Sequence, residues 1–269
     1  METIVTTQVA PLYEGAYYGA LLCDELLCGT AATVLQQLEG GWLCLRAAHG
    51  YRGYGRAEHF LPDRPRAAQW LGRPHLVVTG SCVDVQREPR VKALSTATLL
   101  RGSLVAAAGD AIDGWQPVEL AGGQEGYLPA QHLSPYPLGQ DMGWRELRQA
   151  VCATASSYLG CCYRWGGKTP LGLDCSGLTS QVYLLYGYTI WRDSALLPSH
   201  GVREIDRRQL RPADLLYWPG HTALYLGEER YIHSTATAAG VCVNSLNPAH
   251  PDYRADLAET LAQCGTVLP

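Results

Sequence analysis

The stretch Asp174-Cys175-Ser176-Gly177 decides the interpretation of the second half of this 269-residue chain. It follows a glycine-rich turn, Arg164-Trp165-Gly166-Gly167, and precedes an apolar run of helical character at residues 178–185. The arrangement predicts that one thiol lies in the first turn of a helix. There the unpaired N–H groups and the helix dipole favour an anion, so we expect the sulfur to ionise near neutral pH.

Two histidines downstream, His221 and His233, supply the base that a catalytic thiol needs. Strands are predicted at residues 221–226 and 230–234, joined by a three-residue turn at 227–229. This register makes His233 a diagonal neighbour of His221 on the same face of the sheet. One imidazole can then take the thiol proton, while the other hydrogen-bonds to its second nitrogen and fixes its tautomer.

Each of these residues also has a structural interpretation. A cysteine that opens a helix is usually structural, and a single strand histidine is usually a satisfied polar residue. A zinc site drawing on Cys161, Cys162 or Cys175 with the histidines is a further alternative. Adjacent cysteines lack the Cys-x₂-Cys spacing typical of zinc sites, so neither a metal nor another cofactor is predicted.

The composition excludes several classes of protein. Apolar residues make up 47% and charged residues 17%, as in ordinary globular proteins, and the net charge of −4 gives no reason to expect nucleic acid or a membrane as partner. The ten cysteines lie mostly in apolar segments, unlike those of a secreted disulfide scaffold. Residues 1–8 lack the basic and apolar regions of a secretory signal. We therefore expect a cytoplasmic protein, or a secreted one if a leader has been removed.

The first half of the chain contains an internal repeat. Gly41-Trp42 recurs as Gly114-Trp115, 73 residues later (115 − 42), and the same offset maps Tyr54 onto Tyr127. Each copy reads as short strands separated by glycine-rich turns, which suits a small β-barrel. Residues 64–74 form the predicted join between the copies.

A turn-rich linker at 134–139 separates the repeat from a different pattern. A helix is predicted at 144–159, and further strands at 215–218 and 241–243. Helices followed by a meander of strands predict an α+β domain. The predicted domains are therefore residues 1–70, 71–138 and 139–269.

Six ordered motifs resemble those of a known family. They are Tyr163-Arg-Trp-Gly-Gly, Asp174-Cys-Ser-Gly, Trp191-Arg-Asp-Ser194, Arg211-Pro-Ala-Asp-Leu215, His221-Thr-Ala-Leu-Tyr-Leu-Gly227 and Tyr231-Ile-His233. Over roughly residues 142–246 the chain resembles the NlpC/P60 family of papain-like cysteine peptidases. The duplicated half resembles the bacterial SH3 domains often fused to such peptidases. The combination is similar to the γ-D-glutamyl-L-diamino acid endopeptidases that process peptidoglycan peptides.

This resemblance implies a fold and a reaction. The fold would be α+β, with a papain-like catalytic domain preceded by two small SH3-like β-barrels. The reaction would be hydrolysis of the γ-D-glutamyl-L-diamino acid bond in peptidoglycan-derived peptides that have a free N-terminal L-alanine. Cys175 would be the nucleophile, His221 the base and acid, and His233 the residue that orients His221. The oxyanion donor would be the Cys175 N–H at the helix start.

The resemblance also implies substrate-binding residues. Asp174 and Ser176 would hold the free amine of the L-alanine, joined by Ser194 of the Arg-Asp-Ser motif. The alternative is that Asp174 only caps the helix. Tyr163 either adds its hydroxyl to the site or packs beneath the helix. Tyr51 of the first copy would close the amine end of the site, because the second copy has no tyrosine at the equivalent position.

Other functions are compatible with the same residues. A Cys–His–His site would also serve an N-acetylmuramoyl-L-alanine amidase or a wall-remodelling peptidase. A wall-binding protein with a passive peptidase domain is the non-enzymatic alternative. The sequence leaves open the choice between diaminopimelate and lysine in the substrate, and the oligomeric state.

Overall fold

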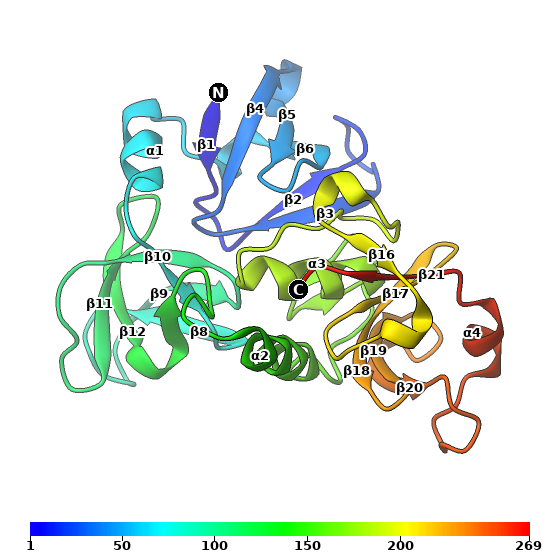
Figure 1. Ribbon diagram of the computed structural model, residues 1–269. Coiled ribbons are helices and arrows are strands. Elements are labelled where there is room, and N and C mark those ends of the chain that lie inside the picture. The colour runs from blue at the N-terminus through cyan, green and yellow to red at the C-terminus, as the bar shows by residue number, and fades with distance from the viewer. The chain divides into compact units, whose positions relative to one another are not determined.

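The computed structural model describes residues 1–269, which divide into two compact units, Met1–Leu138 and Gly139–Pro269 (Figure 1). The first unit consists mainly of strands, and the second combines helices with a sheet. None of the helices combines the length and the apolar character needed to cross a membrane. The elements of both units together make a β-rich mixed fold of helices and several sheets.

The first unit is built on two sheets. The first sheet has the strand order β1-β4-β5-β6-β2-β3. Its strands are β1 (Glu2–Ile4), β2 (Val9–Tyr13), β3 (Leu22–Leu27), β4 (Ala31–Gln37), β5 (Trp42–Ala47) and β6 (Arg52–Arg56). The second sheet has the order β13-β7-β10-β11-β12-β8-β9. Its strands are β7 (Leu76–Val78), β8 (Cys82–Gln86), β9 (Ser95–Leu100), β10 (Leu104–Ala107), β11 (Trp115–Glu119), β12 (Glu125–Pro129) and β13 (Leu133–Pro135).

The internal repeat is present in the structure as a shared strand order. The sequence offset of 73 residues carries β4, β5 and β6 onto β10, β11 and β12, and it carries β2 and β3 onto β8 and β9. Under this correspondence, with β7 in the place of β1, the first order becomes β7-β10-β11-β12-β8-β9. Each sheet buries its own apolar core, around Leu12 and Leu45 in the first and Val85 and Leu128 in the second. The likeness to SH3 domains and the division at residue 70 stay predictions.

A helix occupies the join between the two copies. Helix α1 (Arg64–Leu71) begins after Asp63, whose side chain caps it, and Pro65 lies in its first turn. Trp70 is buried in a cluster that takes residues from both sheets, and its indole N–H donates to the Gly29 carbonyl at 2.9 Å. The segment predicted as the join at residues 64–74 therefore contains a helix, which the sequence analysis did not predict.

The second unit packs helices against a six-stranded antiparallel sheet with the order β16-β21-β17-β18-β19-β20. Its helices are α2 (Trp144–Ser156), α3 (Cys175–Leu185) and α4 (Ala255–Thr260). Its strands are β16 (Arg203–Ile205), β17 (Leu215–Trp218), β18 (His221–Gly227), β19 (Arg230–Thr235), β20 (Gly240–Ser245) and β21 (Gln263–Thr266), besides the short pair β14 (Lys168–Thr169) and β15 (Gly172–Leu173). Helix α3 packs against β18 and β19, and α2 packs against α3 (Figure 1). The predicted helices and strands around the cysteine and the histidines are confirmed.

The turn between β18 and β19 differs from its prediction. Glu228 and Glu229 form a two-residue turn with φ of 53° and 60°, as the tight hairpin turns require, and Gly227 pairs with Arg230. The ladder shifts register between Tyr225 and Gly227, which leaves one extra residue as a bulge. The predicted three-residue turn is wrong, but the bulge restores the predicted pairing for the rest of the hairpin.

Candidate active site

The position of Cys175 follows from the packing of α3 on the sheet. It is the first residue of the helix, and it is buried, with 7% exposure. The backbone N–H groups of Ser176 and Thr222 donate hydrogen bonds to its sulfur. Thr222 follows His221 in β18, so the sulfur lies beside the start of the histidine strand.

The environment of Cys175 keeps the thiol protonated. Burial raises its pKa above the ordinary value, and the neighbouring Asp174 carboxylate raises the pKa further. The hydrogen bonds to the sulfur and the charge of Arg192 lower the pKa, but they do not reverse the shift. The expectation that the sulfur ionises near neutral pH is therefore wrong for the substrate-free site. A base has to take the proton during the reaction.

The two histidines form a hydrogen-bonded pair, as the strand pattern predicts. His221 Nε2 lies 2.7 Å from His233 Nδ1, and the rings meet edge to face with centroids 5.0 Å apart. His233 is fully buried, and its Nε2 lies 2.9 Å from Oδ1 of Asn244 in β20. The sequence pattern did not single out Asn244, which extends the pair to a chain of three side chains.

Asn244 determines where the protons of this chain lie. Its Nδ2 donates to the Asp252 carbonyl at 3.0 Å, so Oδ1 faces His233, and an amide oxygen can only accept. His233 must therefore carry its proton on Nε2 and accept at Nδ1 from Nε2 of His221. This assignment leaves Nδ1 of His221 unprotonated. The chain thus presents a neutral imidazole with one lone pair open to a proton donor.

Burial keeps both imidazoles neutral. It lowers the pKa of His221 to about 4, with smaller effects of the same sign from His233 and Arg254. Burial also lowers the pKa of His233, although the hydrogen bond to Asn244 acts in the opposite direction. A neutral thiol and a neutral base therefore coexist in the resting site.

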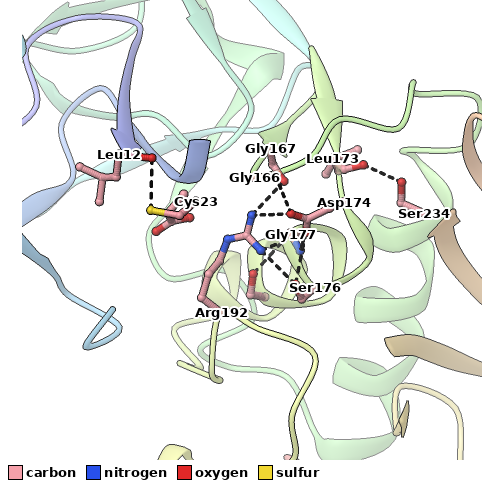
Figure 2. A network of polar contacts seen from close by, with 12 residues as sticks. Leu12, Cys23, Gly166, Gly167, Leu173, Asp174, Ser176, Gly177, Arg192 and Ser234 are labelled. Atoms are coloured by element: carbon pink, nitrogen blue, oxygen red, sulfur yellow. Dashed lines mark hydrogen bonds and ion pairs between the residues drawn. The ribbon is translucent and has the colours of Figure 1, made fainter. Parts of the chain in front are cut away.

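Asp174 makes a buried two-point ion pair with Arg192 (Figure 2). Both contacts measure 2.9 Å, and Arg192 is 1% exposed. The carboxylate also accepts the N–H of Gly166 at 2.8 Å and that of Gly177 at 2.6 Å. Ser176 belongs to the same network, because its hydroxyl donates to Asp174 at 3.2 Å and accepts from Arg192 at 3.0 Å.

This network explains how a carboxylate is accommodated beside the thiol. Arg192 supplies the positive charge that partly offsets the effect of Asp174 on the sulfur. A carboxylate offers roughly four lone-pair positions, and donors from the turn, the helix and Arg192 occupy them. Asp174 caps the helix, because its side chain accepts the N–H of Gly177. Binding of a substrate ammonium by Asp174 and Ser176 stays a prediction.

Gly177 allows the helix to begin directly on the glycine-rich turn. A Cβ atom at this position would lie 2.0 Å from the carbonyl oxygen of Gly167. The same oxygen accepts the N–H of Asp174 at 3.1 Å. A side chain at Gly177 would therefore force the turn and the helix start apart.

The other predicted binding residues lie in different surroundings. Tyr163 is half-buried, and its pKa is raised by burial and then by the charges of Cys175 and Asp174. Its hydroxyl therefore lies within electrostatic reach of the thiol. Ser194 is half-buried and makes no hydrogen bond to the Asp174 network. Tyr51 belongs to the first unit, where it packs against the core of its own sheet, and its role in binding stays a prediction.

The cysteines and histidines do not form a metal-binding group. No cluster of three or more His, Cys, Asp or Glu side chains in the structure is arranged to hold a metal ion. The zinc site considered as an alternative in the sequence analysis therefore lacks a group of side chains to bind the metal ion.

Comparisons with known proteins place the site in a family. The model of the NlpC/P60 family matches residues 160–258. The chain is 38% identical over 270 residues to dipeptidyl-peptidase 6 of Lysinibacillus sphaericus, covering 99% of this chain and 100% of that protein. It is 27% identical over 239 residues to the γ-D-glutamyl-L-lysine dipeptidyl-peptidase of Bacillus cereus, covering 83% of this chain and 70% of that one.

A solved structure shares the fold along the whole chain. The crystal structure of an NlpC/P60 family protein from Bacillus cereus matches with a TM-score of 0.82 and 20% identity, covering 100% of both chains. The cysteine at the start of α3 and the paired histidines lie within the segment that the family model matches. The chain belongs to the NlpC/P60 family of cysteine peptidases.

Proposed function

We propose that this peptidase cuts the γ-D-glutamyl-L-diamino acid bond of peptidoglycan-derived peptides with a free N-terminal L-alanine and releases L-Ala-D-Glu. The chain of His221, His233 and Asn244 beside the Cys175 thiol is the observation that carries the proposal. Two relatives support the choice of bond, since one is named a dipeptidyl-peptidase and the other a γ-D-glutamyl-L-lysine dipeptidyl-peptidase.

Acylation starts from the neutral thiol. Nδ1 of His221 takes the proton as the sulfur of Cys175 attacks the γ-carbonyl carbon of the D-glutamyl residue. The carbon–sulfur bond forms, and the carbonyl electrons move to the oxygen. The backbone N–H of Cys175, at the start of α3, is available to donate to this oxyanion. His233 accepts from Nε2 of His221 and thereby stabilises the imidazolium.

The imidazolium then gives its proton to the departing amine. The carbon–nitrogen bond breaks, the diamino acid leaves, and a thioester joins Cys175 to L-Ala-D-Glu. His221, neutral again, takes a proton from a water molecule that attacks the thioester carbon. The thiolate leaves and recovers the proton from His221, which restores the resting site and releases the dipeptide.

The remaining residues of the site hold the nucleophile in place or bind the substrate in this proposal. Asp174 and Arg192 hold the helix start, and thus the nucleophile, in place. Tyr163, close to the thiol, adds its hydroxyl to the substrate site. Asp174, Ser176 and Ser194 bind the free amine of the L-alanine.

Mass spectrometry of digests tests the proposal. L-Ala-γ-D-Glu-diaminopimelate and its lysine counterpart are incubated with the protein, and both are expected to yield L-Ala-D-Glu with the free diamino acid. Acetylation of the L-alanine amine should slow cleavage, and Cys175→Ala should abolish it. Cleavage between muramic acid and L-alanine would indicate an amidase instead. Absence of any product would favour the wall-binding alternative.

A further inference from the structure

Two adjoining cavities of the second unit contain none of the residues of the cysteine site. Their volumes are about 500 Å³ and 360 Å³. Small-molecule sites typically measure about 300–1,000 Å³. Arg148, Arg211 and Pro269 line both cavities, which therefore share a wall.

Arginine is the only basic residue type in the lining. The lining arginines are Arg145, Arg148, Arg203, Arg208 and Arg211. Arg148 pairs with Asp214 at 2.8 Å, and Arg208 pairs with Asp206 at 2.9 Å. Arg145, Arg203 and Arg211 are exposed, and their side chains make no ion pair or hydrogen bond with the protein.

The acidic side chain of the lining does not neutralise these three arginines. Asp214 already accepts from Arg148, from the Thr266 hydroxyl at 2.6 Å and from the backbone N–H of Arg211 at 2.7 Å. Asp214 is the only acidic side chain in the lining of the two cavities. Because Asp214 is already engaged, the guanidinium groups of Arg145, Arg203 and Arg211 leave the lining with a net positive charge. A ligand with at least two negative charges would balance it.

Trp144 gives the larger cavity an aromatic wall. It is the first residue of α2 and 51% exposed, and Gln149 and Pro212 lie in the same lining. Aromatic rings stack against flat bases and the apolar faces of sugars. Guanidinium groups match phosphate with two parallel hydrogen bonds. The cavity thus combines a place for a ring with a place for phosphate.

We propose that these cavities bind an organic phosphate with at least two negative charges, whose phosphates lie among Arg145, Arg203 and Arg211 and whose ring packs on Trp144. Such a site adds a second ligand to the protein, and it does not depend on the peptidase reaction proposed above. Because its walls come from α2, β16, the segment before β17 and residues 266–269, the second unit alone supplies it.

Isothermal titration of the whole protein at low salt tests this site, with UDP and inorganic pyrophosphate as probes. Saturable binding of UDP is expected. Arg145→Gln and Arg211→Gln should each raise the Kd at least about tenfold, as the loss of a hydrogen bond to a charged group does. Arg230→Gln, an exposed arginine of the same unit outside both cavities, should leave the Kd unchanged. Unaltered urea denaturation of these variants would show that they are folded.

The two probes and a tryptophan variant identify the ligand. UDP should bind more tightly than pyrophosphate, and Trp144→Ala should remove the difference. Equal Kd values for both probes, unaffected by Trp144→Ala, would overturn an organic ligand in favour of an inorganic polyphosphate. No saturable binding at millimolar UDP, or equal Kd values in all three arginine variants, would overturn the site itself.

Discussion

Arg192 and Asp174 are joined at two points inside the protein, and the carboxylate of this pair caps the helix that begins with Cys175. Arg192 lies in a segment without helix or strand. Its guanidinium also donates to the Gly167 carbonyl at 3.3 Å. One side chain thus connects a loop, the glycine-rich turn and the start of the catalytic helix.

Removal of Arg192 should destabilise the protein strongly. Arg192→Leu leaves the Asp174 carboxylate buried without its cation, which typically costs about 3–5 kcal/mol in the free energy of unfolding. Urea denaturation measures the change. Arg207→Leu is the matched control, because Arg207 pairs with Glu229 on the surface and should cost less than about 1 kcal/mol. Equal losses in the two variants would contradict a structural role for the buried pair.

The loss of activity on the acid side of the pH–kcat/KM profile should occur at an unusually low pH. In the proposed mechanism neutral His221 is the base. Burial lowers its pKa from 6.5 to about 4, so kcat/KM should stay flat at pH 5–7 and fall near pH 4. Unfolded chains bind this proton near pH 6.5, so the free energy of unfolding should decrease as the pH falls from about 6.5 towards 4. His200→Gln, outside the histidine chain, should retain the profile. An inflection near pH 6.5 would show that His221 is not held neutral.

Asn244→Asp should move this loss of activity to a higher pH. A carboxylate next to His233 favours its protonated form and so raises its pKa. Protonated His233 donates through Nδ1, which forces His221 to accept at Nε2 and to carry its own proton on Nδ1. That nitrogen can no longer take the thiol proton, so kcat should fall at a higher pH than in the unaltered protein. Asn247→Asp, a nearby asparagine outside the chain, is the control, and matching profiles of the two variants would rule out the relay.

Alkylation should report the neutral state of the thiol. Burial and Asp174 raise the pKa of Cys175, so iodoacetamide should modify it more slowly at pH 7 than it modifies the exposed Cys82 and Cys162. The rate at Cys175 should increase as the pH rises towards 10. Peptide mapping by mass spectrometry measures all three sites in one sample. Preferential modification of Cys175 at pH 7 would mean that the resting site holds a thiolate.

Gly177→Ala should damage both fold and activity. The added methyl group would collide with the Gly167 carbonyl. Overpacking of this kind should lower the free energy of unfolding by roughly 1–3 kcal/mol. Displacement of the helix start also shifts the thiol, so kcat should fall. Gly143→Ala is a suitable control, because a Cβ there meets no atom within 4 Å. Similar unfolding free energies for both variants would refute the close approach.

Local patterns were sufficient to predict the elements that carry the catalytic residues. The cysteine helix, the histidine hairpin and the internal repeat all follow from hydrophobic periodicity and turn residues, which act over a few positions in the chain. The turn at Glu228 and Glu229 escaped prediction because glutamate rarely adopts positive φ. Helix α1 escaped because the proline and aspartate that begin it are also typical of loops.

The residues that complete the site depend on contacts that sequence spacing does not reveal. Arg192 lies within the Arg-Asp-Ser motif, but only tertiary packing shows that it meets Asp174, 18 positions earlier. Asn244 in β20 contacts His233 in the neighbouring strand β19. The orientation of its amide depends on the hydrogen bond to the Asp252 carbonyl. The alternation of residues in β20 would predict which face of the sheet carries Asn244. It would not predict that the amide oxygen accepts a hydrogen bond from the His233 imidazole.

The position of β21 has a consequence for synthesis on the ribosome. This strand comes from residues 263–266 and lies between β16 and β17, so β17 lacks its partner on one side until that segment has left the exit tunnel. The adjoining β18 carries His221, and the sheet that supports it is therefore incomplete in the nascent chain. Translation, which adds roughly 5–20 residues per second, thus delivers β21 after every other strand of the sheet that supports His221.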